Sequence, residues 1–355
     1  MGQSPESSSY NSDKQGVPFY QGNADFGALY PSPRIWCNKP IKLAKENDIL
    51  ISVRAPVGAL NFSKEECCIG RGLAAITLDS NDFLLEFIYW SLRMGVKELQ
   101  SKSTGSTFKS INKKTLEEVR IPKISLKEQK DIIRNLTLLT NILAKYKHEI
   151  VFMDELVKFR FVEMFGDPVS NSKDLPIQKM NNVAPICQYD GSFEERVWLL
   201  NLDMVESQTG RIINYNIVSK DVIGGSVCTF DENNILYSKL RPYLNKVVIP
   251  NGKGYATSEL VPLRPDNKII NRIYLAYLLR SNEFVEMIKE KVAGAKMPRV
   301  SMSDFREFNV PVPPLELQNQ FASFVEEIDK SRSRIQKSLE ASQELFDSLM
   351  QEYFG

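Results

Sequence analysis

Histidine is almost absent from this chain, since His148 is the single histidine among 355 residues. Imidazole is the side chain most often used for proton transfer near neutral pH, so catalysis that depends on histidine is disfavoured. His148 lies beside Tyr146 in the middle of a long amphipathic stretch. We expect a solvated or interfacial side chain there.

Cysteine is scarce and long apolar runs are missing. The five cysteines are odd in number and lack metal-ligand spacing, which predicts reduced thiols and no metal site. The first 20 residues are polar, and no run approaches the roughly 18 apolar residues that a membrane span requires. We therefore expect a cytoplasmic protein. The cysteines are Cys37, Cys67, Cys68, Cys187 and Cys228.

Motifs for nucleotide and metal chemistry are missing as well. There is no GxxxxGK[ST] phosphate loop, and Gly70–Gly72 is typical of a plain turn. No acidic-x-Lys tripeptide follows Pro265 and Asp266, which leaves a metal-dependent nuclease site incomplete. Val312–Glu316 lacks the polar and the aromatic residue of an amino-methyltransferase signature. We expect a non-catalytic protein without a cofactor.

Charge of one sign does not dominate either. A formal net charge of +1 disfavours a protein that coats nucleic acid by charge alone, because phosphate neutralisation supplies most nonspecific affinity. A local basic face remains open, since Lys97 to Lys123 holds seven basic residues against three acidic ones.

What the chain does contain is a tandem repeat. Leu126–Phe165 recurs in degenerate form as Leu315–Phe354, 189 residues downstream, and apolar residues at alternating steps of four and three predict a helix–helix seam in both copies. Arg332 and Ser342 replace apolar seam residues in the second copy, where a bridging role is one interpretation. The expected seam consists of Ile132, Leu136, Leu139, Leu143, Tyr146, Ile150, Met153, Val157, Phe321, Val325, Ile328, Ile335, Leu339 and Phe346.

The repeat extends upstream of each helix. At the same offset Gln129 matches Gln318 and Pro122 matches Pro311, and NDILISVRAP from Asn47 is similar to NNILYSKLRP from Asn233. Short apolar runs separated by Gly, Pro and Asn predict strands, followed by a helix over Asp82–Leu99 and its counterpart over Ile273–Ile288. The predicted parts are residues 1–125 and 167–314, two globular modules, and residues 126–166 and 315–355, two spacer helices.

The alternation of modules and helices resembles the specificity subunit of type I restriction-modification systems. The resemblance rests on Ile121–Gln129 and Val310–Gln318 before the helices, FGDP at Phe165–Pro168, and the opening Gly2–Gly27 together with CIGRGLAAI and STGSTFKSI. It implies a mixed α/β (α+β) fold in which two target-recognition domains are separated by two long antiparallel coiled-coil helices. It further implies double-stranded DNA, methyltransferase subunits and a motor-nuclease subunit as partners. Because the modules differ, we expect an asymmetric, interrupted target.

One departure concerns the start of the first module. Leu175–Val183 opens the second module as a predicted strand, and no equivalent precedes Met1, so the first recognition domain is expected to lack its opening strand.

DNA contacts are expected in loops, where Arg, Lys and small polar side chains can reach phosphates and base edges. Two interpretations from other classes stay open, a coiled-coil scaffold and a self-sufficient restriction enzyme. The candidates are Arg54, Lys102, Thr104, Ser106, Thr107 and Lys109 in the first module and Lys239, Arg241, Lys296 and Arg299 in the second.

Overall fold

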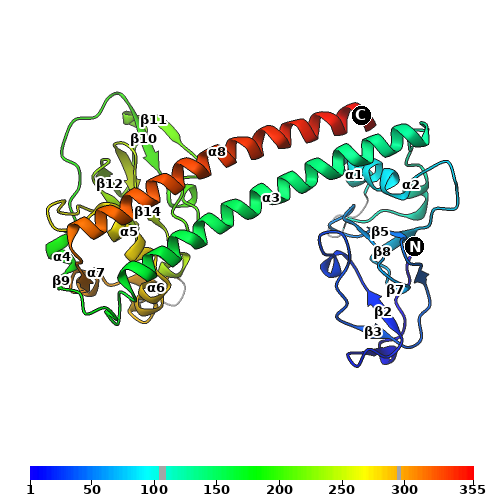
Figure 1. The fold of residues 1–355 in the computed structure, drawn as a ribbon, viewed down its shortest axis with the longest axis horizontal. Coiled ribbons are helices and arrows are strands. Elements are labelled where there is room, and N and C mark those ends of the chain that lie inside the picture. Colours follow the sequence, from blue (N-terminus) through cyan, green and yellow to red (C-terminus); the bar gives the residue numbers. More distant parts are fainter. Residues whose placement is uncertain (104–108, 294–296) are drawn as a thin grey trace. The chain divides into compact units, whose positions relative to one another are not determined.

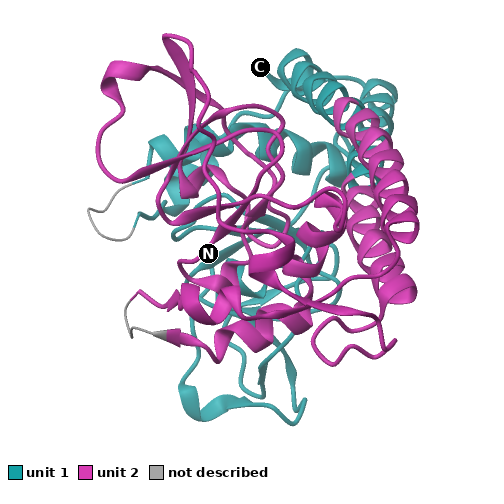
Figure 2. Cartoon of the chain, turned by 90° about the vertical axis from the view of Figure 1, so that its left-hand side faces the viewer, with its two compact units in different colours: residues 1–146, 338–355 teal, residues 147–337 magenta. Residues whose placement is uncertain are grey.

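The computed structural model describes residues 1–103, 109–293 and 297–355. The chain divides into two compact units, shown in different colours in Figure 2: unit 1 is Met1–Tyr146 with Ser338–Gly355, and unit 2 is Lys147–Lys337. Each unit contains one globular module and a part of each long helix (Figure 1). None of the described helices has the length and apolar character needed to cross a membrane.

Unit 1 contains two small sheets of short strands. β5 (Ile49–Ser52) is buried along its whole length, which explains its nearly continuous apolar sequence. The sheet orders are β1-β3-β2-β7-β4 and β6-β5-β8. The other strands are β1 Tyr10–Asn11, β2 Val17–Tyr20, β3 Trp36–Cys37, β4 Leu43–Ala44, β6 Leu60–Phe62, β7 Cys67–Ile69 and β8 Leu73–Ile76.

Two module helices accompany these sheets. α1 (Leu85–Ser101) lies within three residues of the predicted helix and buries Phe87 and Trp90 in one core with residues of both long helices. α2 (Lys113–Glu117) begins at the N-cap Asn112, whose side chain accepts a hydrogen bond from the N–H of Thr115.

Unit 2 also has two main sheets, of orders β11-β10-β15-β12 and β14-β13-β16, together with two strand pairs, β17-β18 and β19-β9. Its strands are β9 Ile177–Lys179, β10 Arg196–Leu200, β11 Asn216–Ser219, β12 Val227–Phe230, β13 Ile235–Ser238, β14 Val247–Val248, β15 Gly254–Thr257, β16 Leu260–Leu263, β17 Val292–Ala293, β18 Arg299–Val300 and β19 Asn309–Pro311. The helices are α4 Met180–Val183, α5 Arg272–Arg280, α6 Asn282–Lys289 and α7 Met302–Arg306. Short 3-10 helices occur in both units. They lie at Ser7–Ser9 and Asn23–Asp25 in unit 1 and at Leu202–Met204, Lys220–Val222 and Pro242–Leu244 in unit 2.

Two expected elements differ in the structure. The helix predicted over Ile273–Ile288 is broken at Ser281, which is extended and whose hydroxyl caps α6 by accepting from the N–H of Phe284, while Asn245 donates to the carbonyl of Arg280. These bonds end α5 and start α6 at one residue. The strand predicted over Leu175–Val183 is a strand only as β9, since its second half forms the helical turn α4.

The two spacer helices have the predicted bounds, α3 (Leu126–Phe165) and α8 (Leu315–Phe354), each of 40 residues. Seam residues next to the modules are buried, and those in the middle are half-buried, because a two-helix seam covers a side chain from one side only. The buried ones are Ile132, Leu136, Leu139, Leu143 and Phe346 in unit 1 and Val157, Phe321 and Val325 in unit 2; Tyr146, Ile150, Met153, Ile328, Ile335 and Leu339 are half-buried.

Within unit 2 the two long helices run antiparallel. The rings of Phe165 and Phe321 lie 5.5 Å apart, and the carboxylate of Asp154 binds the guanidinium of Arg332 at 2.6 Å. A step back along α3 therefore corresponds to a step forward along α8, which is the orientation that the resemblance implied.

The two modules share one strand register. β5 pairs with β8 so that Ile49 faces Ile76, and β13 pairs with β16 so that Ile235 faces Leu263. The sequence match between NDILISVRAP and NNILYSKLRP thus marks equivalent strands in the two units.

Candidate functional site

In unit 1 the segment after β5 is joined to the loop before α2. Arg54 pairs with Ser110 in an isolated β-bridge, and the N–H of Ala55 donates to the carbonyl of Lys109 at 3.0 Å. Arg54 and Lys109 are both exposed. Two of the predicted DNA contacts, 55 positions apart in the sequence, therefore lie on neighbouring backbone segments.

Unit 2 has the same junction with different side chains. Leu240 pairs with Arg299, and the N–H of Arg241 donates to the carbonyl of Pro298 at 2.8 Å. The carbonyl of Lys239 accepts from the next residue of β18, so the three predicted contacts of this unit that the structure describes all lie at the junction.

Arg241 is held in an unusual backbone conformation. Its φ is +49°, in the left-handed region that a β-carbon disfavours. Its side chain is exposed, and Tyr243 and Met297 beside it are 42% and 47% exposed. Strained residues that carry exposed charged and apolar side chains are common at binding loops.

Arg299 already has an acidic partner. Its Nη2 lies 2.7 Å from Oε1 of Glu259, and its Nε lies 3.2 Å from the same oxygen. These hydrogen bonds lower the pKa of Glu259 and raise that of Arg299. An incoming phosphate or base would have to compete with Glu259 for the guanidinium.

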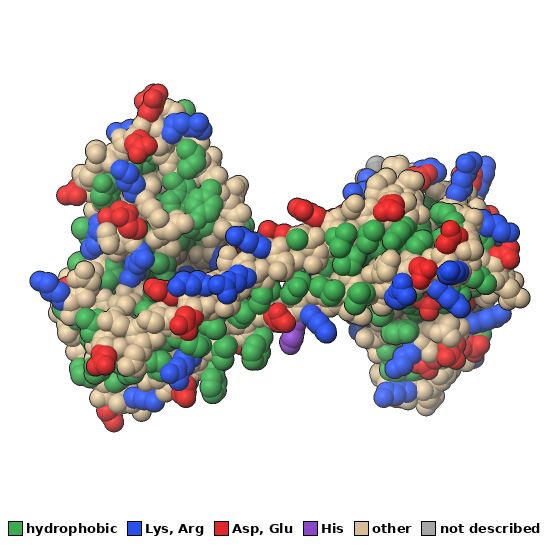
Figure 3. Space-filling model, turned by 45° about the horizontal axis from the view of Figure 1, so that its top comes forward, with side chains coloured by type: hydrophobic (Ala, Val, Ile, Leu, Met, Phe, Trp, Pro, Cys, Tyr) green, Lys and Arg blue, Asp and Glu red, His purple; other side chains and the backbone are tan. Residues whose placement is uncertain are grey.

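The remaining predicted contacts are less informative. Lys102 caps the end of α1 and forms an exposed ion pair with Glu98 at 2.6 Å. Thr104, Ser106, Thr107 and Lys296 lie outside the described residues. Figure 3 shows basic and acidic side chains interspersed on the viewed surface, in keeping with a net charge of +1.

Comparison with known proteins decides what these repeated modules are. The sequence model of the type I restriction modification DNA specificity domain matches residues 2–151 and 203–343. The chain belongs to this family. A solved specificity subunit from M. genitalium has the same fold, with a TM-score of 0.57 at 16% identity over 100% of this chain and 92% of that one.

Two curated type I specificity subunits are also similar to this chain. The putative MjaX specificity subunit of Methanocaldococcus jannaschii is 45% identical over 149 residues, which are 42% of this chain and 35% of the relative. The EcoDI specificity subunit of Escherichia coli is 23% identical over 72% of this chain and 65% of the relative. The alignments thus span about a third and just under two thirds of these relatives. The two modules are hereafter called specificity domains 1 and 2.

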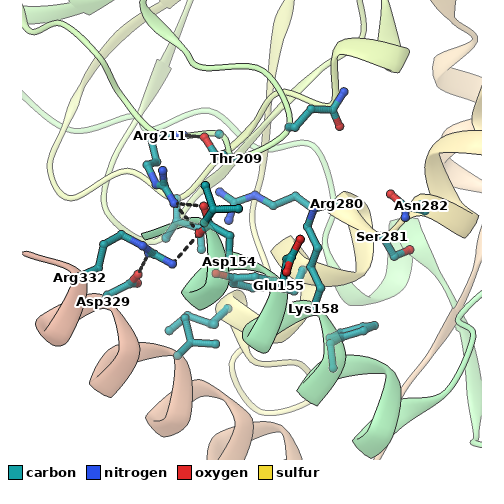
Figure 4. Close-up of a pocket in the computed structure, with 18 of the residues that line it drawn as sticks. Asp154, Glu155, Lys158, Thr209, Arg211, Arg280, Ser281, Asn282, Asp329 and Arg332 are labelled. Atoms are coloured by element: carbon teal, nitrogen blue, oxygen red, sulfur yellow. Dashed lines mark hydrogen bonds and ion pairs between the residues drawn. The ribbon is translucent and has the colours of Figure 1, made fainter. Parts of the chain in front are cut away.

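A cavity of about 730 Å³ lies inside unit 2, between α3, α8 and specificity domain 2 (Figure 4). On its wall Asp154 of α3 accepts from Arg211 of the domain at 2.5 Å and from Arg332 of α8 at 2.6 Å, and Arg332 also pairs with Asp329. One carboxylate therefore ties both long helices to the domain. In the sequence, only Arg332 at an apolar seam position indicated this cluster. No sequence pattern singled out Asp154 or Arg211.

Arg280 forms the floor of this cavity. Its Nη2 and Nε donate to the carbonyl of Val247 at 2.5 and 3.1 Å, and its guanidinium lies 5.2 Å from the ring centroid of Tyr277. Burial lowers the pKa of Arg280. All of these interactions are made within the domain. They account for the position of Arg280 at the cavity without a bound ligand.

Other chemistry has little support in the described part of the chain. No group of three or more His, Cys, Asp or Glu side chains there has the arrangement of a metal site. All five cysteines are free, and burial raises the pKa of Cys67 and of Cys228 to about 11, which makes both thiols poor nucleophiles at neutral pH. His148 is exposed on α3.

Proposed function

We propose that this chain is the DNA-recognition subunit of a type I restriction-modification complex. Each specificity domain reads one half of an interrupted site, and α3 with α8 sets the distance between the halves. The observation that carries the proposal is the junction that both domains repeat, with Arg54 and Lys109 in one and Arg241 and Arg299 in the other. The same scaffold presenting different side chains suits two half-sites of different sequence.

Recognition at these junctions combines two kinds of contact. Lys109 and Arg241 are exposed cations suited to phosphates, which position a protein on the duplex, and bases are read by side chains that reach into a groove. Since the net charge of the chain is only +1, affinity depends on these local cations and on bound partners.

The proposed partners are double-stranded DNA, methyltransferase subunits and a motor-nuclease subunit, in the cytoplasm. The chain itself is proposed to be non-catalytic, with methylation and cleavage supplied by the other subunits. This assignment is supported by family membership and by relatives that are specificity subunits of type I restriction enzymes.

The test is to purify the chain with its methyltransferase partner and to map methylated bases by sequencing of a methylation-deficient host that expresses both. The expected result is one asymmetric target of two short half-sites with a fixed gap. A complex that binds no DNA would favour the scaffold interpretation, and cleavage by the chain alone would favour a self-sufficient enzyme. Exchanging specificity domain 2 for that of a relative should change one half-site only.

A further inference from the structure

A short turn of specificity domain 2 displays an aromatic side chain beside the junction. The turn is the 3-10 helix Pro242–Leu244, and Tyr243 in its middle is 42% exposed. Within the described part of the chain no residue forms a hydrogen bond with its hydroxyl or stacks a ring against its own. The ring also lies outside the apolar core clusters of the unit. Packing within the domain therefore does not explain an aromatic residue at this position.

The main chain of this turn is fixed at both ends. Arg241 before it and Asn245 after it both have a φ of +49°, a conformation that is unfavourable for residues with a β-carbon. The N–H of Arg241 donates to the carbonyl of Pro298 at 2.8 Å, and the side-chain amide of Asn245 donates to the carbonyl of Arg280 at 2.8 Å. These tertiary hydrogen bonds hold the turn in its unfavourable conformation.

A second segment holds the same turn from the side. The N–H of Gln208 donates to the carbonyl of Leu244 at 3.0 Å, and its side-chain amide donates to the carbonyl of Tyr243 at 3.0 Å. The main chain at Tyr243 is thus positioned before any ligand binds. A tyrosine held in this way offers a large contact area and loses little conformational entropy on binding.

Specificity domain 1 uses the equivalent position differently. By the strand register that the two modules share, Val57 corresponds to Tyr243. Both main-chain carbonyls accept from a glutamine side chain, that of Gln100 at 2.9 Å in domain 1 and that of Gln208 in domain 2. Val57, however, is 4% exposed and belongs to an apolar core cluster. The same position anchors the turn in one domain and displays a ring in the other.

The displayed ring lies next to the proposed DNA contacts of domain 2. Arg241, two residues before it, is exposed, and Met297, which precedes the Pro298 that binds Arg241, is 47% exposed. A cation suited to a phosphate is therefore combined with apolar side chains. In the major groove the apolar feature of a base edge is the C5-methyl group of thymine.

We propose that Tyr243 is a base-reading residue of specificity domain 2 and that its ring contacts the methyl group of a thymine in the half-site. This inference rests on the proposed function, because it requires the junction to face DNA. Arg241 positions the turn on the phosphates, and the ring excludes water from the methyl group. A base without this methyl group loses the contact, which corresponds to about three- to fivefold in affinity.

The test measures the affinity of the chain, with its methyltransferase partner, for duplexes that contain the mapped target. In each duplex one thymine of the domain 2 half-site, on either strand, is replaced with uracil, which lacks only the methyl group. One replacement should weaken binding by wild type about three- to fivefold and should have no effect on Tyr243→Ala. Tyr243→Phe keeps the ring and should respond to uracil as the wild type does. The salt dependence of binding should not change in either variant, because no charge is lost.

The control is Ile213→Ala, which shortens an apolar side chain of unit 2 that is 64% exposed and lies outside the junction. This variant should keep the response of the wild type to uracil. A similar loss of the response in Ile213→Ala would overturn the assignment to Tyr243.

Three further results would overturn the proposal. One is a response to uracil that persists in Tyr243→Ala. Another is a domain 2 half-site in which no thymine responds to the replacement, or which contains no thymine. The third is a loss of affinity in Tyr243→Ala that is equal for all DNA sequences, which would make the ring a backbone contact.

These results differ from a failure of the proposed function. Each of them is obtained with a wild-type complex that discriminates between half-site sequences, so the proposed function stands. A wild-type complex without sequence preference would overturn the proposed function together with this inference.

Discussion

Gln129 and Gln318 make the same three hydrogen bonds, each in its own unit. Gln129 is 0% exposed, and its Oε1 accepts from the N–H of Leu84, the residue that precedes α1, at 2.8 Å. Its Nε2 donates to the carbonyls of Asp82 and Ile124 at 2.8 and 3.0 Å. One amide side chain thus joins the start of α3 to the start of the main helix of the domain.

Gln318 repeats the arrangement in unit 2. Its Oε1 accepts from the N–H of Asn271, the N-cap of α5, at 2.7 Å, and its Nε2 donates to the carbonyls of Ile269 and Pro313 at 3.2 and 2.7 Å. It is also 0% exposed. The amide is the one side chain of this size with an acceptor and two donors, which explains glutamine at both positions.

Replacing Gln129 with Leu should destabilise unit 1 by about 1–3 kcal/mol, because it leaves the N–H of Leu84 and two carbonyls, all in partly buried hydrogen bonds, without their partner. Denaturant unfolding of the full chain measures the loss. Gln351→Leu is the matched control, since that side chain is exposed on α8 in the same unit. Equal midpoints for the two variants would show that the bonds contribute nothing.

These glutamines also show what the sequence could and could not predict. The repeat pairs Gln129 with Gln318, and the seam pattern predicts the bounds of α3 and α8, because both signals are local or periodic. The break at Ser281 depends on Asn245 reaching the carbonyl of Arg280, a tertiary contact that no local pattern encodes. The Arg299–Glu259 pair likewise joins residues that only the folded domain brings together.

Asp154 should be the most sensitive charged residue of unit 2. Asp154→Asn leaves Arg211 and Arg332 without their shared carboxylate, and with side chains 35% and 14% exposed we expect a loss of about 1–3 kcal/mol. Glu155→Gln, one residue away and exposed, is the control. A double-mutant cycle of Asp154→Asn with Arg332→Met should show a coupling energy of about 1 kcal/mol; additivity would contradict the ion pair.

Leu143 of α3 lies in the helix–helix seam, whereas Leu138 lies on the outer surface of the same helix. Leu143 is 7% exposed and Leu138 is 58% exposed. Leu143→Asn should cost about 2–4 kcal/mol through lost apolar burial and a buried amide, whereas Leu138→Asn should stay within about 0.5 kcal/mol. Thermal and denaturant unfolding of both variants test this, and similar losses would place the seam elsewhere on the helix.

Lys109→Ala and Arg299→Ala should each weaken binding to one half-site. If the side chain contacts a phosphate, affinity should fall for all DNA sequences, and the slope of log K against log salt concentration should decrease in magnitude by about one. If the side chain reads a base, the free-energy discrimination between bases at one position of the half-site should decrease by about 1–3 kcal/mol. Titration of half-site variants with the methyltransferase complex distinguishes these results. Lys64→Ala, an exposed lysine in a turn of unit 1, is the control. Wild-type affinity in both variants would remove the two junctions from the DNA interface.

Glu259 gives a prediction about pH. The hydrogen bond from Arg299 lowers the pKa of Glu259 from its ordinary 4.5, so the folded state favours the carboxylate. A carboxyl group whose pKa is lowered by folding stabilises the protein at pH values above its unfolded pKa, and this stability is lost as the pH falls through the folded pKa. The Glu259–Arg299 pair should therefore persist at neutral pH and break only below about pH 4.5. A carboxyl NMR titration should show the Glu259 pKa rising in Arg299→Ala. The same pair affects DNA binding if Arg299 contacts DNA. Glu259→Gln should then raise the affinity for the half-site of domain 2, because the guanidinium of Arg299 no longer has to break an ion pair before it binds. Reduced affinity would mean that Glu259 positions Arg299 for binding.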